Sequence, residues 1–88
     1  MTYSIKLSTS VTDSLKQLDK RLLQRVLKKI KWLSENFEKT KQVQLTGPYS
    51  GLYKYRIGNY RLIYSIDHTE KVIFVAYFAH RSDAYKKH

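Results

Sequence analysis

The sequence predicts an α+β fold, a small single domain in which two N-terminal helices pack on a mainly antiparallel sheet. The expected element order is β-α-α-β-β-β. Two early segments repeat apolar residues at helical spacing, residues 51–64 alternate like a β-hairpin, and residues 71–79 are almost continuously apolar. Helices followed by a run of strands are typical of this fold class. A chain of 88 residues is the size of one domain, so we expect residues 1–88 to form a single unit.

The first third of the chain predicts one strand and two helices. Tyr3–Leu7 alternates apolar and polar residues, as a strand does, and the hydroxyls that follow it can cap a short helix over about Ser10–Leu18. Asp19 can cap a longer helix whose apolar positions recur from Leu22 to Phe37. The other positions of this second helix are mostly basic: Lys20, Arg21, Arg25, Lys28, Lys29 and Lys31.

The hairpin expected over Gly51–Tyr64 places positive charges on strands. Gly58-Asn59 marks a tight turn between two runs of β-forming residues. Alternation puts Lys54 and Arg56 on one face, and on the return strand Arg61 points away from the face of Tyr60. Cations fixed on strands suit the recognition of phosphate, although a sheet face that simply meets water explains each cation equally well.

The rest of the chain predicts a connection and one further strand. Glu38–Gln44 is polar and without helical period, so we expect a connection there, followed by a turn at 46–48. Another polar turn over Asp67–Glu70 separates the hairpin from Lys71–Ala79. The continuous apolar character of that segment predicts a central strand that is buried on both faces.

The charge of the chain indicates a polyanionic partner. Seventeen Lys and Arg against seven Asp and Glu give a net charge of +10 and a sequence pI near 9.9. The candidates are a nucleic acid, an anionic membrane and an acidic protein. No apolar run approaches the roughly 20 residues that a membrane span needs, and no signal-peptide pattern opens the chain. The chain has no cysteine, and we expect a cytoplasmic protein without a membrane partner.

The polar residues after the last strand are candidates for chemistry. His80 and Tyr85 can donate or accept a proton, and Arg81 can stabilise a charged transition state. The acidic residues are scattered, there is no cysteine, and the histidines lack ligand spacing, so we expect no metal and no cofactor. If the chain is an enzyme that acts on nucleic acid, it must work without a metal, and the simplest such chemistry is cleavage of RNA by the substrate's own 2′-hydroxyl group.

Three pieces of the sequence together resemble a known family. They are Gly51–Arg56, Tyr60–Tyr64 and His80–Tyr85, and their order and spacing are similar to those of the RelE group within the RelE/ParE toxin superfamily. The resemblance covers nearly the whole chain and implies a RelE-like fold. It implies the toxin of a type II toxin–antitoxin system, an endoribonuclease that cleaves mRNA in the ribosomal A site and inhibits translation. Its expected partners are a cognate antitoxin protein, the ribosome and mRNA.

The resemblance also implies roles for individual residues. The implied catalytic residues are Lys54, Arg61, His80, Arg81 and Tyr85, and Arg56 is the implied substrate-binding residue. Which of His80, Lys54 and Tyr85 is the general base is left open by the sequence.

Two other functions remain open at this stage. ParE-like members share the architecture but inhibit DNA gyrase without nuclease activity, and a non-catalytic RNA-binding module would also explain the charge. The cationic hairpin combined with the residues from His80 to Tyr85 favours the ribonuclease.

Overall fold

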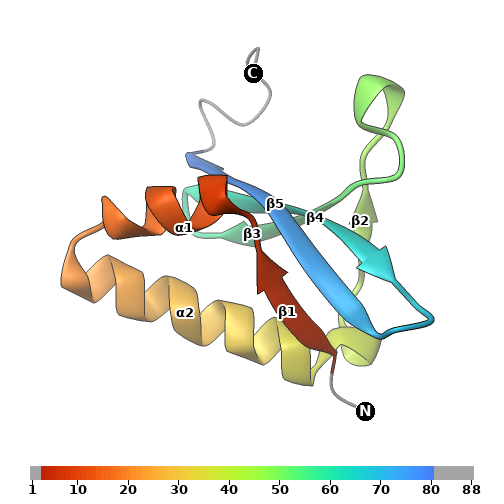
Figure 1. The fold of residues 1–88 in the computed structure, drawn as a ribbon, viewed down its shortest axis with the longest axis horizontal. Helices are drawn as coiled ribbons and strands as arrows, with labels where there is room; N and C mark the ends of the chain where they lie inside the picture. The colour runs from red at the N-terminus through yellow and green to blue at the C-terminus, as the bar shows by residue number, and fades with distance from the viewer. Residues whose placement is uncertain (1–2, 81–88) are drawn as a thin grey trace.

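The structure is a computed structural model, and it describes residues 3–80 (Figure 1). The elements are β1 (Ser4–Leu7), α1 (Thr9–Lys16), α2 (Lys20–Glu35), η1 (Phe37–Lys39), β2 (Val43–Gln44), η2 (Gly47–Tyr49), β3 (Tyr53–Ile57), β4 (Tyr60–Asp67) and β5 (Val72–His80). Here η marks a single 3₁₀ turn. The predicted fold class and the predicted order of the main elements are confirmed.

The five strands form one sheet in the order β1-β5-β4-β3-β2. The first strand pairs parallel with the last, Ser4 lying beside Val72, and every other neighbouring pair is antiparallel. The sheet is therefore mainly antiparallel, as predicted. Its parallel pair joins segments that are far apart in the sequence.

Both helices begin at the polar residues that the sequence offers as caps. The Ser8 side chain accepts a hydrogen bond from the Val11 amide at 3.2 Å, and Asp19 Oδ1 accepts one from the Leu22 amide at 2.9 Å. Each bond satisfies a backbone donor that the first turn of a helix leaves without a partner. In the described part of the chain, no helix is long and apolar enough to cross a membrane.

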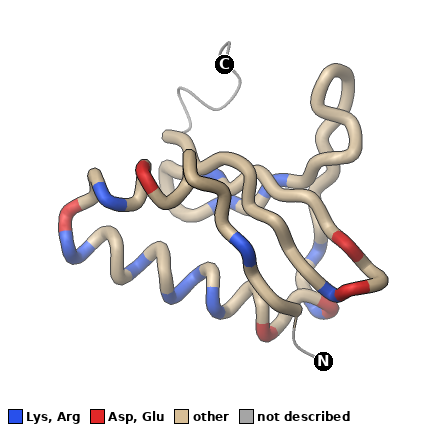
Figure 2. The backbone as a smooth tube through the Cα atoms, viewed as in Figure 1, with Lys and Arg blue, Asp and Glu red and all other residues tan. Residues whose placement is uncertain are grey.

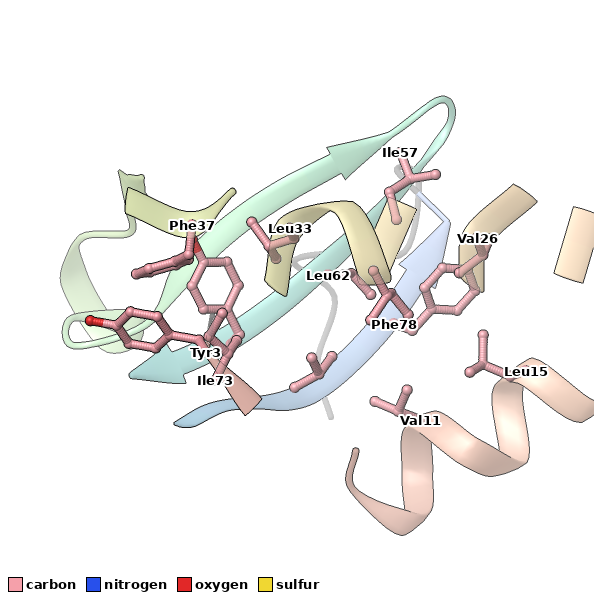
Figure 3. Packing of buried hydrophobic residues seen from close by; sticks show 13 residues of the cluster. Tyr3, Val11, Leu15, Val26, Leu33, Phe37, Ile57, Leu62, Ile73 and Phe78 are labelled. Carbon is pink, nitrogen blue, oxygen red and sulfur yellow. The ribbon is translucent and has the colours of Figure 1, made fainter. Parts of the chain in front are cut away.

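The core lies between the two helices and one face of the sheet (Figure 3). Val26 and Leu33 of α2 pack over Leu62 and Phe78 of the sheet, and α1 adds Val11. Val11, Val26, Leu33 and Leu62 have no exposed surface. No helix of the described chain covers the other face, which we call the open face of the sheet.

The prediction that the last strand is buried on both faces is wrong. In β5, Ile73, Val75 and Phe78 are buried against the helices, whereas Phe74 and Tyr77 on the open face are each 42% exposed. An apolar run shows only that polar residues are absent and does not show whether both faces of the strand are covered. Here the helices cover only one face of the sheet. The strand does lie inside the sheet, between β1 and β4.

The short edge strand β2 was not predicted. Its two residues, Val43 and Gln44, pair with Lys54 and Tyr53 in the stretch that the sequence indicated to be a connection. Two residues are too few to show an alternating pattern, so no periodicity distinguishes this strand from a loop. The chain between β2 and β3 extends away from the body of the domain (Figure 1).

Candidate nucleic-acid interface

The hairpin of β3 and β4 brings three cations together on the open face. Arg56 pairs directly with Arg61, and Lys54 pairs with Ile63. Residues that lie opposite each other on neighbouring strands point to the same side of a sheet, so Lys54, Arg56 and Arg61 share one side. We call this group the cationic face. The alternation that the sequence predicted for these residues is confirmed.

The hairpin turn fixes one end of the cationic face. Ile57 pairs with Tyr60, which leaves Gly58 and Asn59 as a two-residue loop, and Gly58 has a φ of 58°. A positive φ at the first loop residue alone is the pattern of a type II′ turn, which favours glycine at that position. Arg56 Nε donates a hydrogen bond to the Gly58 carbonyl at 3.3 Å, so this side chain lies along the turn.

The charges of the cationic face favour the binding of an anion. Arg56 is exposed, Arg61 and Lys54 are half-buried, and like charges directly opposite each other on two strands repel. The acidic residues of the described chain lie in the helices, between them, in η1, at the end of β4 and in the turn after it (Figure 2). An anionic group bound beside Arg56 and Arg61 would relieve this repulsion and could accept paired hydrogen bonds from a guanidinium group.

A surface hollow borders Lys54. Its other lining residues come from β2 and from the segment that leads into η2: Val43, Gln44, Leu45, Thr46, Gly47, Pro48 and Tyr49. The amide of Leu45 donates to the carbonyl of Leu52 at 2.9 Å, which holds this segment beside β3. The hollow therefore continues the open face from the cationic face toward the edge of the sheet.

The basic side of α2 forms a second positive surface (Figure 2). Arg21, Arg25, Lys28 and Lys29 line a shallow hollow there together with Gln24. Arg25 reaches the hairpin turn, because a Cβ atom added to Gly58 would lie 3.3 Å from its guanidinium nitrogen. Positive charge therefore extends from the helix to the turn that follows Arg56.

The structure separates His80 from the cationic face. His80 pairs with Tyr60, and their rings meet edge to face with centroids 5.3 Å apart. The Tyr60 ring in turn stacks on core residue Phe78 at 5.0 Å. His80 therefore lies on the helix side of the sheet, whereas its neighbour Ala79 pairs with Arg61 on the open face. The predicted site residues Arg81 and Tyr85 lie outside the described residues.

Two tyrosines of the hairpin, Tyr64 and Tyr55, are unsuited to proton transfer at neutral pH. Burial raises the pKa of Tyr64 to about 12, and the nearby phenol groups of Tyr53 and Tyr55 add to this rise. Burial also raises the pKa of Tyr55 above its usual value. Since a general base must be deprotonated near the working pH, neither phenol can act as a base at neutral pH.

The raised pKa of Tyr64 predicts a loss of stability in alkaline solution. Below pH 10 the phenol is protonated in both folded and unfolded chains; between about pH 10 and 12 only the unfolded chain releases the proton, so the free energy of unfolding falls with pH. The slope of the free energy of unfolding against pH depends on how many protons unfolding releases, and we expect Tyr64→Phe to lower that number by about one. Urea titrations from about pH 9 to 12 measure the free energy of unfolding of both proteins. If it falls with pH equally steeply in wild type and in Tyr64→Phe, the raised pKa of Tyr64 is contradicted.

One residue of the open face was missed by the sequence interpretation. Tyr77 pairs with Ile63, which in turn pairs with Lys54, so all three point to the same side. Tyr77 lies inside a continuous apolar run, which predicted a buried strand, so an exposed side chain was not expected there. Its exposure is visible only once the strand has been placed in the sheet.

No group of three or more His, Cys, Asp or Glu side chains within residues 3–80 is placed to hold a metal ion. What these residues offer instead is an open sheet face with fixed positive charges and an aromatic side chain. That combination can bind a phosphate backbone and neighbouring bases.

Solved toxin structures share this architecture. The RelBE2 toxin–antitoxin complex of Mycobacterium tuberculosis contains a chain 26% identical to this one, with a TM-score of 0.82, covering 94% of this chain and 95% of that chain. The RelE–RelB complex of the archaeon Pyrococcus horikoshii contains a chain 32% identical, with a TM-score of 0.73, covering 96% and 100%. A mutant of Escherichia coli RelE in the free state shares the fold at 21% identity, with a TM-score of 0.73, covering 96% and 88%.

The fold is therefore that of the RelE/ParE toxin superfamily, as the sequence resemblance implied. Over residues 5–85 the chain matches the family described as the ParE toxin of type II toxin–antitoxin systems, and it belongs to that family. A search of curated proteins found no match.

Proposed function

We propose that this toxin is a metal-independent endoribonuclease that cleaves mRNA in the ribosomal A site and so stops translation. The observation that carries the proposal is the cationic face, in which Arg56 and Arg61 are directly opposed and Lys54 lies on the same side. A ribonuclease of this kind must hold one phosphate and stabilise the extra negative charge that develops on it.

The chemistry uses the RNA itself as nucleophile. The 2′-oxygen loses its proton to a base and bonds to the adjacent phosphorus, and the bond from phosphorus to the 5′-oxygen then breaks as that oxygen gains a proton. The products are a 2′,3′-cyclic phosphate and a free 5′-hydroxyl. Arg56 and Arg61 are proposed to bind the phosphate and offset the transition-state charge, and Lys54 is proposed for proton transfer because it lies on the same side of the sheet.

The remaining sequence-predicted roles stay proposals. Arg81 is proposed to contact the phosphate, and Tyr85 to transfer a proton or stack on a base. We also propose a cognate antitoxin as partner, which is supported by the net charge of +10 and by the toxin–antitoxin complexes among the similar structures. An antitoxin that covers the cationic face would block access of RNA to it.

The second candidate function is inhibition of DNA gyrase without cleavage of RNA. The description of the matched family, which names ParE, supports this alternative. A gyrase inhibitor has no need of two arginines paired across neighbouring strands beside a lysine, and for that reason we place the ribonuclease first.

The test is primer extension on a reporter mRNA in a purified translation system, with and without ribosomes. A ribosome-dependent cut that disappears when the 2′-hydroxyl at the scissile position is replaced by hydrogen supports the proposal. If the folded toxin leaves the mRNA intact but traps cleaved DNA with gyrase, the second function holds. Salt-sensitive RNA binding without any product would indicate a binding module instead.

Comparison of two substitutions tests whether Lys54 or His80 takes part in proton transfer. Lys54 lies on the cationic face and His80 on the helix side, so we expect Lys54→Ala to slow cleavage by about 10²–10⁴ and His80→Gln to slow it less than tenfold. Single-turnover rates on programmed ribosomes across a pH series measure both effects. A larger loss for His80→Gln, with a changed pH profile, would restore His80 as a proton carrier.

A further inference from the structure

We infer that Tyr77 is the base-stacking and specificity-determining residue of the cationic face. The inference rests on the proposed function and deepens it, because it identifies the part of the protein that contacts a nucleobase next to the bound phosphate. It follows from the position of Tyr77 in the sheet, from its exposure and from the charges around it.

The position of Tyr77 depends on an irregularity in β5. Ile63 pairs with Tyr77 but the next residue of β4, Tyr64, pairs with Val75, so Ala76 is an extra residue in the strand. Val75 faces the core, and uninterrupted alternation would turn Tyr77 toward the core as well. The extra residue reverses the alternation and places Tyr77 on the open face.

Ser8 holds this irregularity in place. Its hydroxyl group donates to the Ala76 carbonyl at 2.9 Å, and its amide donates to the Val75 carbonyl at 3.0 Å. The same side chain caps α1. Bulges that redirect a side chain occur preferentially next to functional sites, and here the bulge is tied to the start of a helix.

Tyr77 lies across the sheet from the cations. Lys54, Ile63 and Tyr77 form one row over three neighbouring strands, and strand spacing puts the backbones of its ends about 10 Å apart. Ile63, only 4% exposed, forms the floor between them. Arg61 is a diagonal neighbour of Tyr77, because its direct partner Ala79 is two residues further along β5.

The ring of Tyr77 is both exposed and firmly supported. The side chain is 42% exposed, while its neighbour Phe78 and, beyond Ala76, Val75 are buried in the core. A tyrosine has few rotatable bonds, so little conformational entropy is lost when it binds a flat ligand. An aromatic ring beside fixed cations is the combination that binds single-stranded RNA, in which bases stack on the ring while cations hold the backbone.

Phe74 provides a matched control on the same strand. It is also 42% exposed and on the open face, but it pairs with Ser65 and Lys6, in the row next to that of Tyr77 and on the side away from Arg61. Phe74→Leu therefore removes an equally exposed ring from the same sheet face, at a position that is further from Arg61 than Tyr77 is.

The experiment compares wild-type protein, Tyr77→Phe, Tyr77→Leu and Phe74→Leu on ribosomes programmed with mRNAs that vary at the cleaved codon. A stacking contact exists before and during the reaction, so we expect Tyr77→Leu to raise KM about 5- to 100-fold with kcat changed less. We also expect it to flatten the preference among codons. Tyr77→Phe keeps the ring and Phe74→Leu leaves Tyr77 in place, so both should stay within about threefold of wild type. Circular dichroism checks that each variant is folded.

The possible failures are distinguishable. If wild type cleaves RNA and Tyr77→Leu keeps its KM and codon profile, the role of Tyr77 is overturned and the proposed function stands. If wild type cleaves no RNA, the proposed ribonuclease function and the role of Tyr77 are both wrong. If Tyr77→Leu weakens only the binding of an antitoxin, the ring is an apolar protein contact and the inference is wrong. The inference is also wrong if Tyr77→Leu and Tyr77→Phe have the same KM and codon preference.

Discussion

Arg61→Ala is expected to lower the rate of mRNA cleavage by about 10²–10³, the usual cost of removing one preorganised charge-stabilising donor. Arg61 lies opposite Arg56 on the open face, and its guanidinium group can hold two phosphate oxygens at once. Single-turnover cleavage on programmed ribosomes measures the loss. Arg61 is only half-buried and lies outside the hydrophobic core, so we expect the variant to fold, and circular dichroism checks this.

Arg21→Ala is the matched control for this substitution. It removes the same side chain and the same charge from an exposed position on α2. If net charge alone drives binding, both variants lose activity equally and depend more weakly on salt. A folded Arg61→Ala protein that cleaves at the wild-type rate would remove Arg61 from the proposed mechanism.

Leu62→Ala is expected to lower the free energy of unfolding by about 2–5 kcal/mol. Leu62 is fully buried on β4, between the sheet neighbours Tyr55 and Phe78 and beneath the helices (Figure 3). Deleting its side chain leaves a cavity that a tightly packed core fills only in part. Urea titration followed by circular dichroism measures the change.

Leu27→Ala is the control for this second prediction. Leu27 is 45% exposed on α2, so the same deletion there should change stability by less than about 0.5 kcal/mol. Equal unfolding midpoints for the two variants would show that Leu62 does not lie in the core. Total stability of a small domain is about 5–15 kcal/mol, so Leu62→Ala should reduce toxicity through loss of folded protein, whereas Arg61→Ala should reduce it with the fold intact.

The hairpin and the helices were predictable because their signals are local. Gly58 permits the tight turn, and alternating residues on both sides of it determine which side chains share a face. Ser8 and Asp19 each stand three residues before the first apolar residue of a helical pattern, and each caps a helix in the structure. These features need only neighbouring residues, and they placed Lys54 and Arg56 correctly.

The parts that could not be predicted depend on distant contacts. The run from Val72 to Ala79 has no polar residue to mark a face, so its sequence contains no sign of the extra residue at Ala76. The bulge determines that Tyr77 faces outward and that His80 lies on the helix side. The resemblance grouped His80 with the cations by its order in the chain, whereas the pairing of β4 with β5 separates them.

The pairing of β1 with β5 affects how the protein can fold while it is being synthesised. These strands lie parallel, and residues 4–7 must wait for residues 72–75 before they can enter the sheet. Contacts between segments so far apart in a chain form slowly, since a long loop must close first. During synthesis the helices and the hairpin can form early, but the sheet cannot be completed until almost all of this sequence has left the ribosome. The cationic face, whose strands β3 and β4 belong to the same sheet as β1 and β5, would therefore reach its final form only when synthesis is nearly complete.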